Sequence, residues 1–363
     1  MKNIYLEIAD TENTDIGAVL ATVTRTQGST PQKPGSSALF SGKGLISGTV
    51  GGGIVEGRVH KAAMDALITK KSGHYTFNLY NDISETEEAI CGGEISVLLD
   101  ANPDNSFSVF RQIRQSIEER IPGVLVTMVT DADDSAVLIS RYWMSNRIIP
   151  DIRKDFLEKI APVVADQIAK GNSYDFREMT LVIPGEETES HFFLEPVFPP
   201  DHLVIAGAGH VGKALARLGN WLGFEITVID DRSEYANREN IPDADHIIVE
   251  DIGSALRTLA KKEDTFVVIV TRGHKDDAEA LKPCIGAALA YTGMIGSKKK
   301  VALMRESFIE KGIATREQWD RIHTPIGLDI GSQTVEEIAV SIAAQLIQVR
   351  NRRRKAEGVR GEE

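Results

Sequence analysis

The segment LVIAGAGHVGKALA, residues 203–216, indicates the fold class of the C-terminal half of the chain. An apolar strand pattern leads into Gly207, Gly209 and Gly212, which have the spacing G-x-G-x-x-G, and an amphipathic helix pattern follows. The first glycine permits a tight turn, the second lets a phosphate approach the backbone, and the third lets helix and strand pack closely. The segment predicts phosphate binding at a helix N-terminus; the alternative is a Rossmann domain that has lost its nucleotide.

From His202 onward, strand and helix patterns alternate along the chain. We expect strands at residues 203–206, 225–230, 246–249, 265–271 and 291–295. Such alternation predicts a parallel, doubly wound sheet. The second strand ends at Asp230, near the offset at which an acidic side chain meets a ribose hydroxyl, so Asp230 is a cofactor-binding candidate. His210, inside the glycine loop, either donates a hydrogen bond to a phosphate or is an exposed loop histidine.

The fourth of these strands is followed by RGHKDD, residues 272–277. Loops at the carboxyl ends of parallel strands line the ligand crevice, so Arg272 and His274 are binding candidates, with a merely polar loop as the alternative. The segments GMIGSKKK, residues 293–300, and RIHTPIGLDIGSQT, residues 321–334, either hold phosphate or form packing turns.

A second glycine cluster lies in ISGTVGGGIVEGRV, where a strand ends at Gly51, Gly52 and Gly53 and a helix begins. A helix start offers free N–H groups and is a ready anion site. Glu56 falls in the first helical turn, and we expect Arg25, near the end of an earlier strand, to face the same place. The alternative is a structural turn that needs positive φ at several glycines.

The chain contains two cysteines, Cys91 and Cys284. Cys91 precedes two glycines and is either a buried hydrophobic residue or a thiolate stabilised by backbone N–H groups. Cys284 lies in a helix pattern and is expected in the core. No cysteine or histidine cluster has metal-ligand spacing, so we expect no metal site.

The 363 residues are enough for two domains. The proline-rich run PVFPPDH, residues 196–202, marks the expected boundary. We therefore expect an N-terminal α+β domain over 1–198, whose middle, about 105–190, carries no chemistry-bearing motif. A Rossmann-like domain over 199–350 and a disordered tail over 351–363 follow.

The formal net charge of −12 argues against nucleic acid as the main partner, because phosphate-backbone binding needs a basic surface. The chain start shows no signal-peptide pattern, and its apolar runs are shorter than the ~20 residues of a membrane span. We therefore expect a cytoplasmic protein without a membrane partner. A homodimer is the default assembly for a soluble chain.

Taken together, the segments of this chain resemble the xanthine dehydrogenase accessory protein family (XdhC/CoxI). The matching stretches are RTQGSTPQKPGS, TVGGGIVEG, CGGE, FLEPVFPP, GAGHVGKALA, VIDDR, TRGHKDD, YTGMIGSKKK and RIHTPIGLDIGSQTVEEIAVSI. They cover both ends of the chain in the family's order. The resemblance implies an α/β protein in which an N-terminal α+β XdhC/CoxI-like domain precedes a Rossmann-like domain.

The resemblance also implies a function. A family member binds molybdenum cofactor, which is molybdopterin in mono- or dinucleotide form, assists its sulfuration with a cysteine desulfurase, and inserts it into a xanthine dehydrogenase-type molybdenum hydroxylase. It would act as a cofactor chaperone more than as a stand-alone enzyme. The positions carried over by motif are Arg25, Gly51, Gly52, Gly53, Glu56, Cys91, Gly207, Gly209, Gly212, Asp230, Arg272 and His274. Ile54 stands where relatives often have Cys or Ser, which leaves Cys91 as the candidate catalytic thiol.

Two other hypotheses compete with the chaperone. An NAD(P)-dependent oxidoreductase would need a proton donor, for which His274, Cys91 and His323 are the candidates. A regulatory module that senses an adenine nucleotide would need the Rossmann loop and no chemistry. Release of pterin, turnover of a nicotinamide nucleotide, and binding of adenine nucleotides alone separate the three hypotheses.

Overall fold

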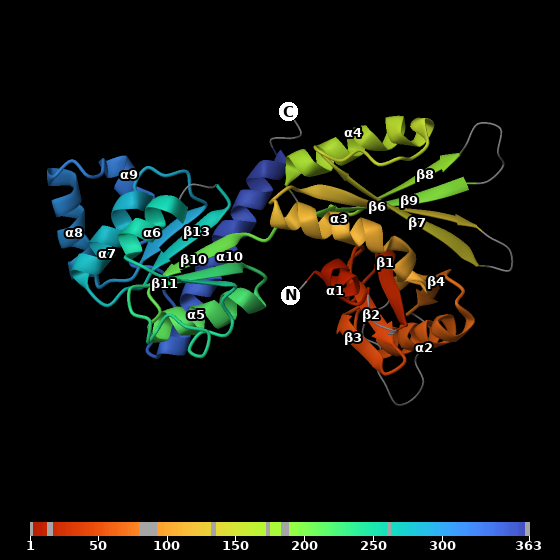
Figure 1. Ribbon diagram of the computed structural model, residues 1–363, viewed down its shortest axis with the longest axis horizontal. Coiled ribbons are helices and arrows are strands. Elements are labelled where there is room, and N and C mark those ends of the chain that lie inside the picture. The colour runs from red at the N-terminus through yellow and green to blue at the C-terminus, as the bar shows by residue number, and fades with distance from the viewer. Residues whose placement is uncertain are drawn as a thin grey trace. The chain divides into compact units, whose positions relative to one another are not determined.

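The computed structural model describes residues 3–12, 17–79, 93–131, 136–171, 175–182, 189–259 and 263–359. The chain forms two compact units, Lys2–Pro199 and Pro200–Ala356 (Figure 1). Each unit has hydrophobic clusters made only of its own residues. Among the described helices, none combines the length and the hydropathy of a membrane-spanning segment.

The first unit contains a five-stranded antiparallel sheet in the order β3-β2-β1-β5-β4. Its strands are β1 Ala18–Gly28, β2 Ser37–Ser41, β3 Gly44–Gly48, β4 Gly73–Asn78 and β5 Gly93–Asp100. Because successive side chains of a strand point to opposite faces, alternate residues of β1 such as Val19 and Val23 meet helix α2, Gly53–Thr69. Val55 and Val59 belong to the apolar stripe of α2 that covers this face.

A four-stranded antiparallel sheet in the order β7-β6-β9-β8 completes the first unit. Its strands are β6 Gly123–Asp131, β7 Val137–Ser145, β8 Arg177–Val182 and β9 Glu189–Val197. Helix α4, Lys154–Lys170, packs on one face through Phe156 and Val164. The remaining helices are α1 Ile4–Asp10, η1 Pro103–Ser106 and α3 Phe107–Glu118. Leu20 of the first sheet and Leu125 of the second sheet belong to one hydrophobic cluster, which also contains side chains of α1 and α3.

The second unit is built on a five-stranded sheet in the order β12-β11-β10-β13-β14, and every neighbouring pair is parallel. The strands are β10 His202–Ala206, β11 Glu225–Asp230, β12 His246–Val249, β13 Thr265–Ile269 and β14 Tyr291–Met294. The predicted parallel sheet of Rossmann type is confirmed, and so is the fold class of an α+β part followed by this domain.

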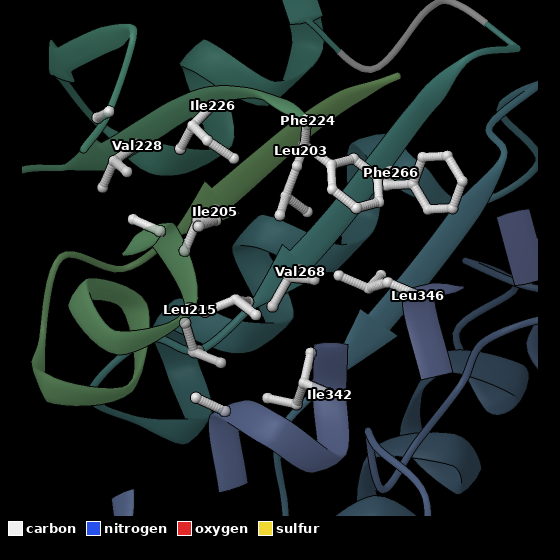
Figure 2. Close-up of a cluster of buried hydrophobic side chains, with 14 of the residues drawn as sticks. Leu203, Ile205, Leu215, Phe224, Ile226, Val228, Phe266, Val268, Ile342 and Leu346 are labelled. Atoms are coloured by element: carbon white, nitrogen blue, oxygen red, sulfur yellow. The ribbon is translucent and has the colours of Figure 1, made fainter. Parts of the chain in front are cut away.

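Helices cover both faces of the parallel sheet. Figure 2 shows Leu215 of α5, His210–Trp221, with Ile342 and Leu346 of α10, Val335–Val359, beside strand residues of one face. The helices α6 Ile252–Leu259, α7 His274–Leu281, η3 Lys282–Cys284, α8 Lys298–Glu310 and α9 Arg316–Asp320 follow the later strands. The side chains of these helices pack on the other face, together with the buried Cys284 predicted for the core.

Helix α10 differs from its predicted length. It continues to Val359, through most of the segment 351–363 for which the sequence predicts a disordered tail. Two arginines close to residue 351 contact aromatic rings of the core. The guanidinium of Arg350 lies 4.6 Å from the ring centre of Phe224, and that of Arg353 lies 5.9 Å from the ring centre of Phe266. Cation–π contacts of this kind attach the helix to the aromatic part of the core.

Candidate functional site

Two glycines of the β10–α5 loop are required by space. Gly207 has a φ of +120°, and a Cβ there would lie 2.5 Å from the carbonyl oxygen of Val270. A Cβ at Gly212 would lie 1.9 Å from the carbonyl oxygen of Gly207, because the helix packs directly on the loop. These positions therefore shape the turn and the approach of α5 to the sheet.

Gly209 has a different role. Its φ of −71° suits any residue, and a Cβ there would meet nothing within 4 Å. It precedes α5, whose first turn carries no acidic residue and whose N-cap makes no side-chain hydrogen bond. The first amide groups of a helix lack intrahelical acceptors and favour negative charge. Open space in front of such amides suits a phosphate group.

A cavity of about 200 Å³ lies beside this loop. It is lined by Gly207, Gly209, His210, Asp230, Asp231, Arg232, Tyr235, Ile252, Val270, Thr271, Arg272 and Asp276. All of these residues lie at or after the carboxyl ends of parallel strands. The strand order reverses between the neighbours β10 and β13, and ligands of open α/β sheets bind in the crevice at such a point. The structure thus brings together the predicted residues of the glycine loop, Asp230 and Arg272.

Asp230 is engaged by its own chain. Its carboxylate is 2% exposed and accepts hydrogen bonds from the Ala208 amide at 2.8 Å and the Arg232 amide at 3.1 Å. The Arg232 guanidinium donates to both of its oxygens, from Nε at 2.8 Å and Nη2 at 2.9 Å. Burial alone would raise the pKa of Asp230, but these hydrogen bonds lower it overall. The carboxylate therefore ties the glycine loop to the end of β11.

Charged side chains form the rim of the cavity. Arg272 donates from Nη2 to Asp231 at 3.0 Å and from Nε to Asp276 at 3.2 Å. The guanidinium of Arg232 lies 4.0 Å from the ring centre of Tyr235. His210 is exposed at the start of α5. A hydrogen bond from His210 to a phosphate stays a prediction.

In the loops that follow β13 and β14, the polar side chains mainly contact other residues of the chain. The buried carboxylate of Asp277 accepts hydrogen bonds from the Thr271 hydroxyl and the Lys300 ammonium group. Ser297 caps α8 by accepting from the Lys300 amide at 3.3 Å. The His323 ring stacks on Tyr291, with ring centres 4.6 Å apart. These contacts favour the packing alternative for both segments.

The second glycine cluster forms a tight turn into α2. Gly51, Gly52 and Gly53 have φ values of +135°, +65° and +55°. A Cβ at Gly51 would lie 2.6 Å from Cγ of Pro31, so the two turns pack on each other. A carboxylate oxygen of Glu56 lies 3.8 Å from the Cβ position of Gly52. This carboxylate would compete with an anion for the N-terminus of α2. The structure therefore better supports the interpretation that the turn needs glycines for their positive φ. Contact of these glycines with a ligand stays a prediction.

Arg25 lies against the second sheet of its unit, which differs from the expectation that it faces the glycine turn. Its Nε donates to Glu178 of β8 at 2.6 Å. The cause is a β-bulge between Val23 and Arg25, which places Arg25 opposite Ser96. A bulge inserts one residue and moves the following side chains to the other face.

Two predicted residues lie partly or wholly outside the described set. Cys91 falls outside it, so its role as a thiol stays a prediction. The backbone of His274 begins α7, but its side chain is outside the described set. Within the described ranges, no group of three histidine, cysteine or acidic residues is arranged to hold a metal ion.

A polar cluster that no sequence motif indicated lies between the two sheets of the first unit. The Tyr5 hydroxyl donates to Glu195 of β9, and Arg141 of β7 forms a buried ion pair with Asp100 of β5. Protein atoms surround the Glu195 carboxyl, although part of the residue's surface remains accessible. Burial raises the pKa of Glu195 from its ordinary value near 4.5 to about 7. The sequence contains one signal for this cluster. A charged residue stands at an inward-facing position of an apolar strand in FLEPVF, which holds Glu195, and in ISRYWM, which holds Arg141.

Two family models match the chain. The model described as the XdhC and CoxI family matches residues 13–78, and the model described as the XdhC Rossmann domain matches residues 203–346. The second match contains the glycine loop and the lining residues of the cavity. The first match contains the second glycine cluster.

The matches to known proteins cover different shares of the chain. A protein of Escherichia coli K12 named "Uncharacterized protein YqeB" is 39% identical over 150 residues, which are 41% of this chain and 27% of that protein. The chain thus spans about a quarter of that relative. A Bacillus subtilis 168 protein, named as a probable xanthine dehydrogenase subunit, is 26% identical over 337 residues, which are 92% of this chain and 94% of that protein.

A solved structure has the same fold over nearly the whole chain. It is a crystal structure described as a xanthine dehydrogenase from Bacillus halodurans. It has 25% sequence identity and a TM-score of 0.74, and the match covers 96% of each chain.

Proposed function

Because this chain belongs to the XdhC and CoxI family, we propose that it is an accessory factor in the maturation of a xanthine dehydrogenase-type molybdenum hydroxylase. In this proposal it binds molybdenum cofactor, assists its sulfuration together with a cysteine desulfurase, and delivers it to the hydroxylase. The names of the Bacillus relatives, which refer to xanthine dehydrogenase, support the link to that enzyme.

One observation carries the binding part of the proposal. The cavity at the strand-order reversal of the parallel sheet combines an uncapped helix N-terminus, open space at Gly209 and a rim that bears Arg232 and Arg272. Molybdenum cofactor carries a phosphate group and hydrogen-bonding ring edges. The amides of α5 suit the phosphate, and the charged rim suits the polar part of the molecule.

The nicotinamide oxidoreductase is less well supported. Its candidate proton donors are His274, Cys91 and His323. His323 is stacked on Tyr291 and is not among the described residues that line the cavity. Burial lowers the pKa of His323, so a smaller fraction of its ring is protonated near neutral pH and able to donate a proton.

The test is to incubate the purified chain with molybdenum cofactor, remove free cofactor, and measure the fluorescence of pterin released from the protein. Recovered protein is then mixed with cofactor-free xanthine dehydrogenase, and the return of xanthine oxidation is followed. We expect retained pterin and restored activity, with no turnover of NADH or NADPH by the chain alone.

A matched pair of variants locates the binding. A Gly209→Ala substitution places a methyl group in the open space before α5 and should lower pterin retention about tenfold. A Gly42→Ala substitution in the β2–β3 turn, where a Cβ would make only ordinary contact with Leu67, should leave retention unchanged. Absence of pterin retention by the unaltered chain, or catalytic oxidation of NADH or NADPH, would contradict the proposal.

A further inference from the structure

Two consecutive carboxylates at the end of β11 lie in different surroundings. The side chain of Asp230 is 2% exposed, whereas that of Asp231 is 47% exposed. Both line the cavity. The acidic group that follows this strand in a Rossmann fold is the one positioned to receive ribose hydroxyls. Only one of the two carboxylates can do so here.

Asp230 has no acceptor capacity left for a ligand. Its two oxygens accept four hydrogen bonds, from the amides of Ala208 and Arg232 and from two nitrogens of the Arg232 guanidinium. A carboxylate offers about four lone-pair sites. A ligand hydroxyl could bind Asp230 only by displacing donors that hold the glycine loop in place.

Asp231 keeps acceptor capacity and is held at the rim. Among the described residues it receives Arg272 Nη2 at 3.0 Å, and Arg232 Nε lies 3.9 Å away. The two arginines fix the position of the carboxylate and leave lone pairs that face solvent. Their positive charge also reduces the repulsion that Asp231 would exert on a nearby phosphate.

The charges of the lining indicate the class of ligand. Three carboxylates, those of Asp230, Asp231 and Asp276, stand against two guanidinium groups, those of Arg232 and Arg272. This rim does not form a purely cationic phosphate trap. It suits a molecule that brings a phosphate to the amides of α5 and hydrogen-bond donors to an exposed carboxylate.

We propose that the cavity takes a ribonucleotide end of its ligand, with the phosphate at Gly209 and the ribose hydroxyls donating to Asp231. Asp230 then serves only to hold the loop. This inference rests on the proposed function, since it concerns the same cavity, and it assigns the nucleotide-bearing form of the cofactor to the site. It also moves the ribose-acceptor role from Asp230, where the sequence pattern puts it, to the next residue.

The experiment compares the binding of ADP and 2′-deoxy-ADP to the full chain by isothermal titration calorimetry. The two probes differ by a single ribose hydroxyl. We expect the unaltered chain to bind ADP about tenfold more tightly, because the hydroxyl bonds a charged acceptor. In Asp231→Asn the amide oxygen is a weaker acceptor than a carboxylate, so the ratio of the two affinities should fall to about two, with an unchanged melting temperature.

Two further variants complete the design. Asp320→Asn removes another exposed carboxylate that pairs with an arginine, Arg305, and lies outside the cavity lining, so the ratio should stay at about ten. Asp230→Asn should lower the melting temperature and still retain a preference for ADP.

Three outcomes would overturn the inference: no binding of ADP, equal affinity for both probes, or loss of the preference in Asp230→Asn with retention in Asp231→Asn. The pterin assay reports separately on the proposed function. Pterin retention without a ribose preference overturns only this inference, and a ribose preference without pterin retention overturns only the chaperone function.

Discussion

Gly209 and Gly212 belong to one loop but differ in what surrounds their α-carbons. A Cβ at Gly212 would collide with the carbonyl oxygen of Gly207 at 1.9 Å, whereas a Cβ at Gly209 would meet open space. We expect Gly212→Ala to lower the free energy of unfolding by roughly 1–3 kcal/mol, as overpacking does. Gly209→Ala should leave it within about 0.5 kcal/mol. Chemical denaturation of the two variants measures both values, and equal losses would contradict the assignment of separate roles.

Glu195 should make the stability of the first unit depend on pH. Its pKa is about 7 in the folded chain and near 4.5 when unfolded, so the folded state binds more protons between these values. Stability from this group is therefore complete below pH 4.5 and is lost as the pH rises to 7. The difference corresponds to at most about 3 kcal/mol.

The variant Glu195→Gln tests this dependence. The amide can still accept the Tyr5 hydroxyl but cannot ionise. We expect the melting temperature of the unaltered chain to fall, relative to the variant, as the pH rises from 5 to 8. Tyr5→Phe removes the hydroxyl and keeps the carboxyl, so its pH dependence should persist. Parallel melting curves for Glu195→Gln and the unaltered chain across this pH range would show that the carboxyl does not titrate there.

At the scale of elements, the start of α10 depends on a reciprocal cap. The Thr334 hydroxyl accepts from the Glu337 amide at 3.2 Å, and Glu337 accepts from the Thr334 amide at 3.1 Å. Hydrogen bonds from the Gln333 and Thr334 amides lower the pKa of Glu337. The capping box is thus present, and it fixes the helix that supplies Ile342 to the core.

Thr334→Ala should cost about 1 kcal/mol of helix stability. We expect faster hydrogen exchange of the amides in the first turn of α10, together with a lower denaturation midpoint for the second unit. Thr334→Ser keeps the hydroxyl and should behave nearly as the unaltered chain does. Unchanged exchange in the alanine variant would mean that packing alone holds this end of the helix.

The bulge in β1 shows what one element can change. If β1 alternated regularly, Arg25 would lie on the face that packs against α2, whereas the bulge lets Arg25 pair with Glu178 of the second sheet. Counting alternate residues along β1 does not give the direction of every side chain, because the bulge shifts the register of the strand.

At the scale of the whole molecule, the hydrophobic clusters of the second unit contain residues of that unit alone. We therefore expect a fragment of residues 200–356 to fold by itself and to unfold cooperatively. The fluorescence of the buried Trp319 during thermal unfolding measures this. A fragment that binds hydrophobic dyes strongly and shows no sigmoidal transition would mean that its core is incomplete without residues 1–199.

The amino-acid sequence alone predicts the parallel sheet, the glycine loop and the helix that begins after the second glycine cluster, because strand and helix periods and the need for positive φ are local properties of the chain. The tertiary structure alone decided which partner each polar side chain takes. It buried Asp230 and exposed Asp231, turned Arg25 toward Glu178, and enclosed Glu195 between two sheets. Hydrogen-bond partners and burial depend on residues that are distant in sequence, so no local pattern encodes them.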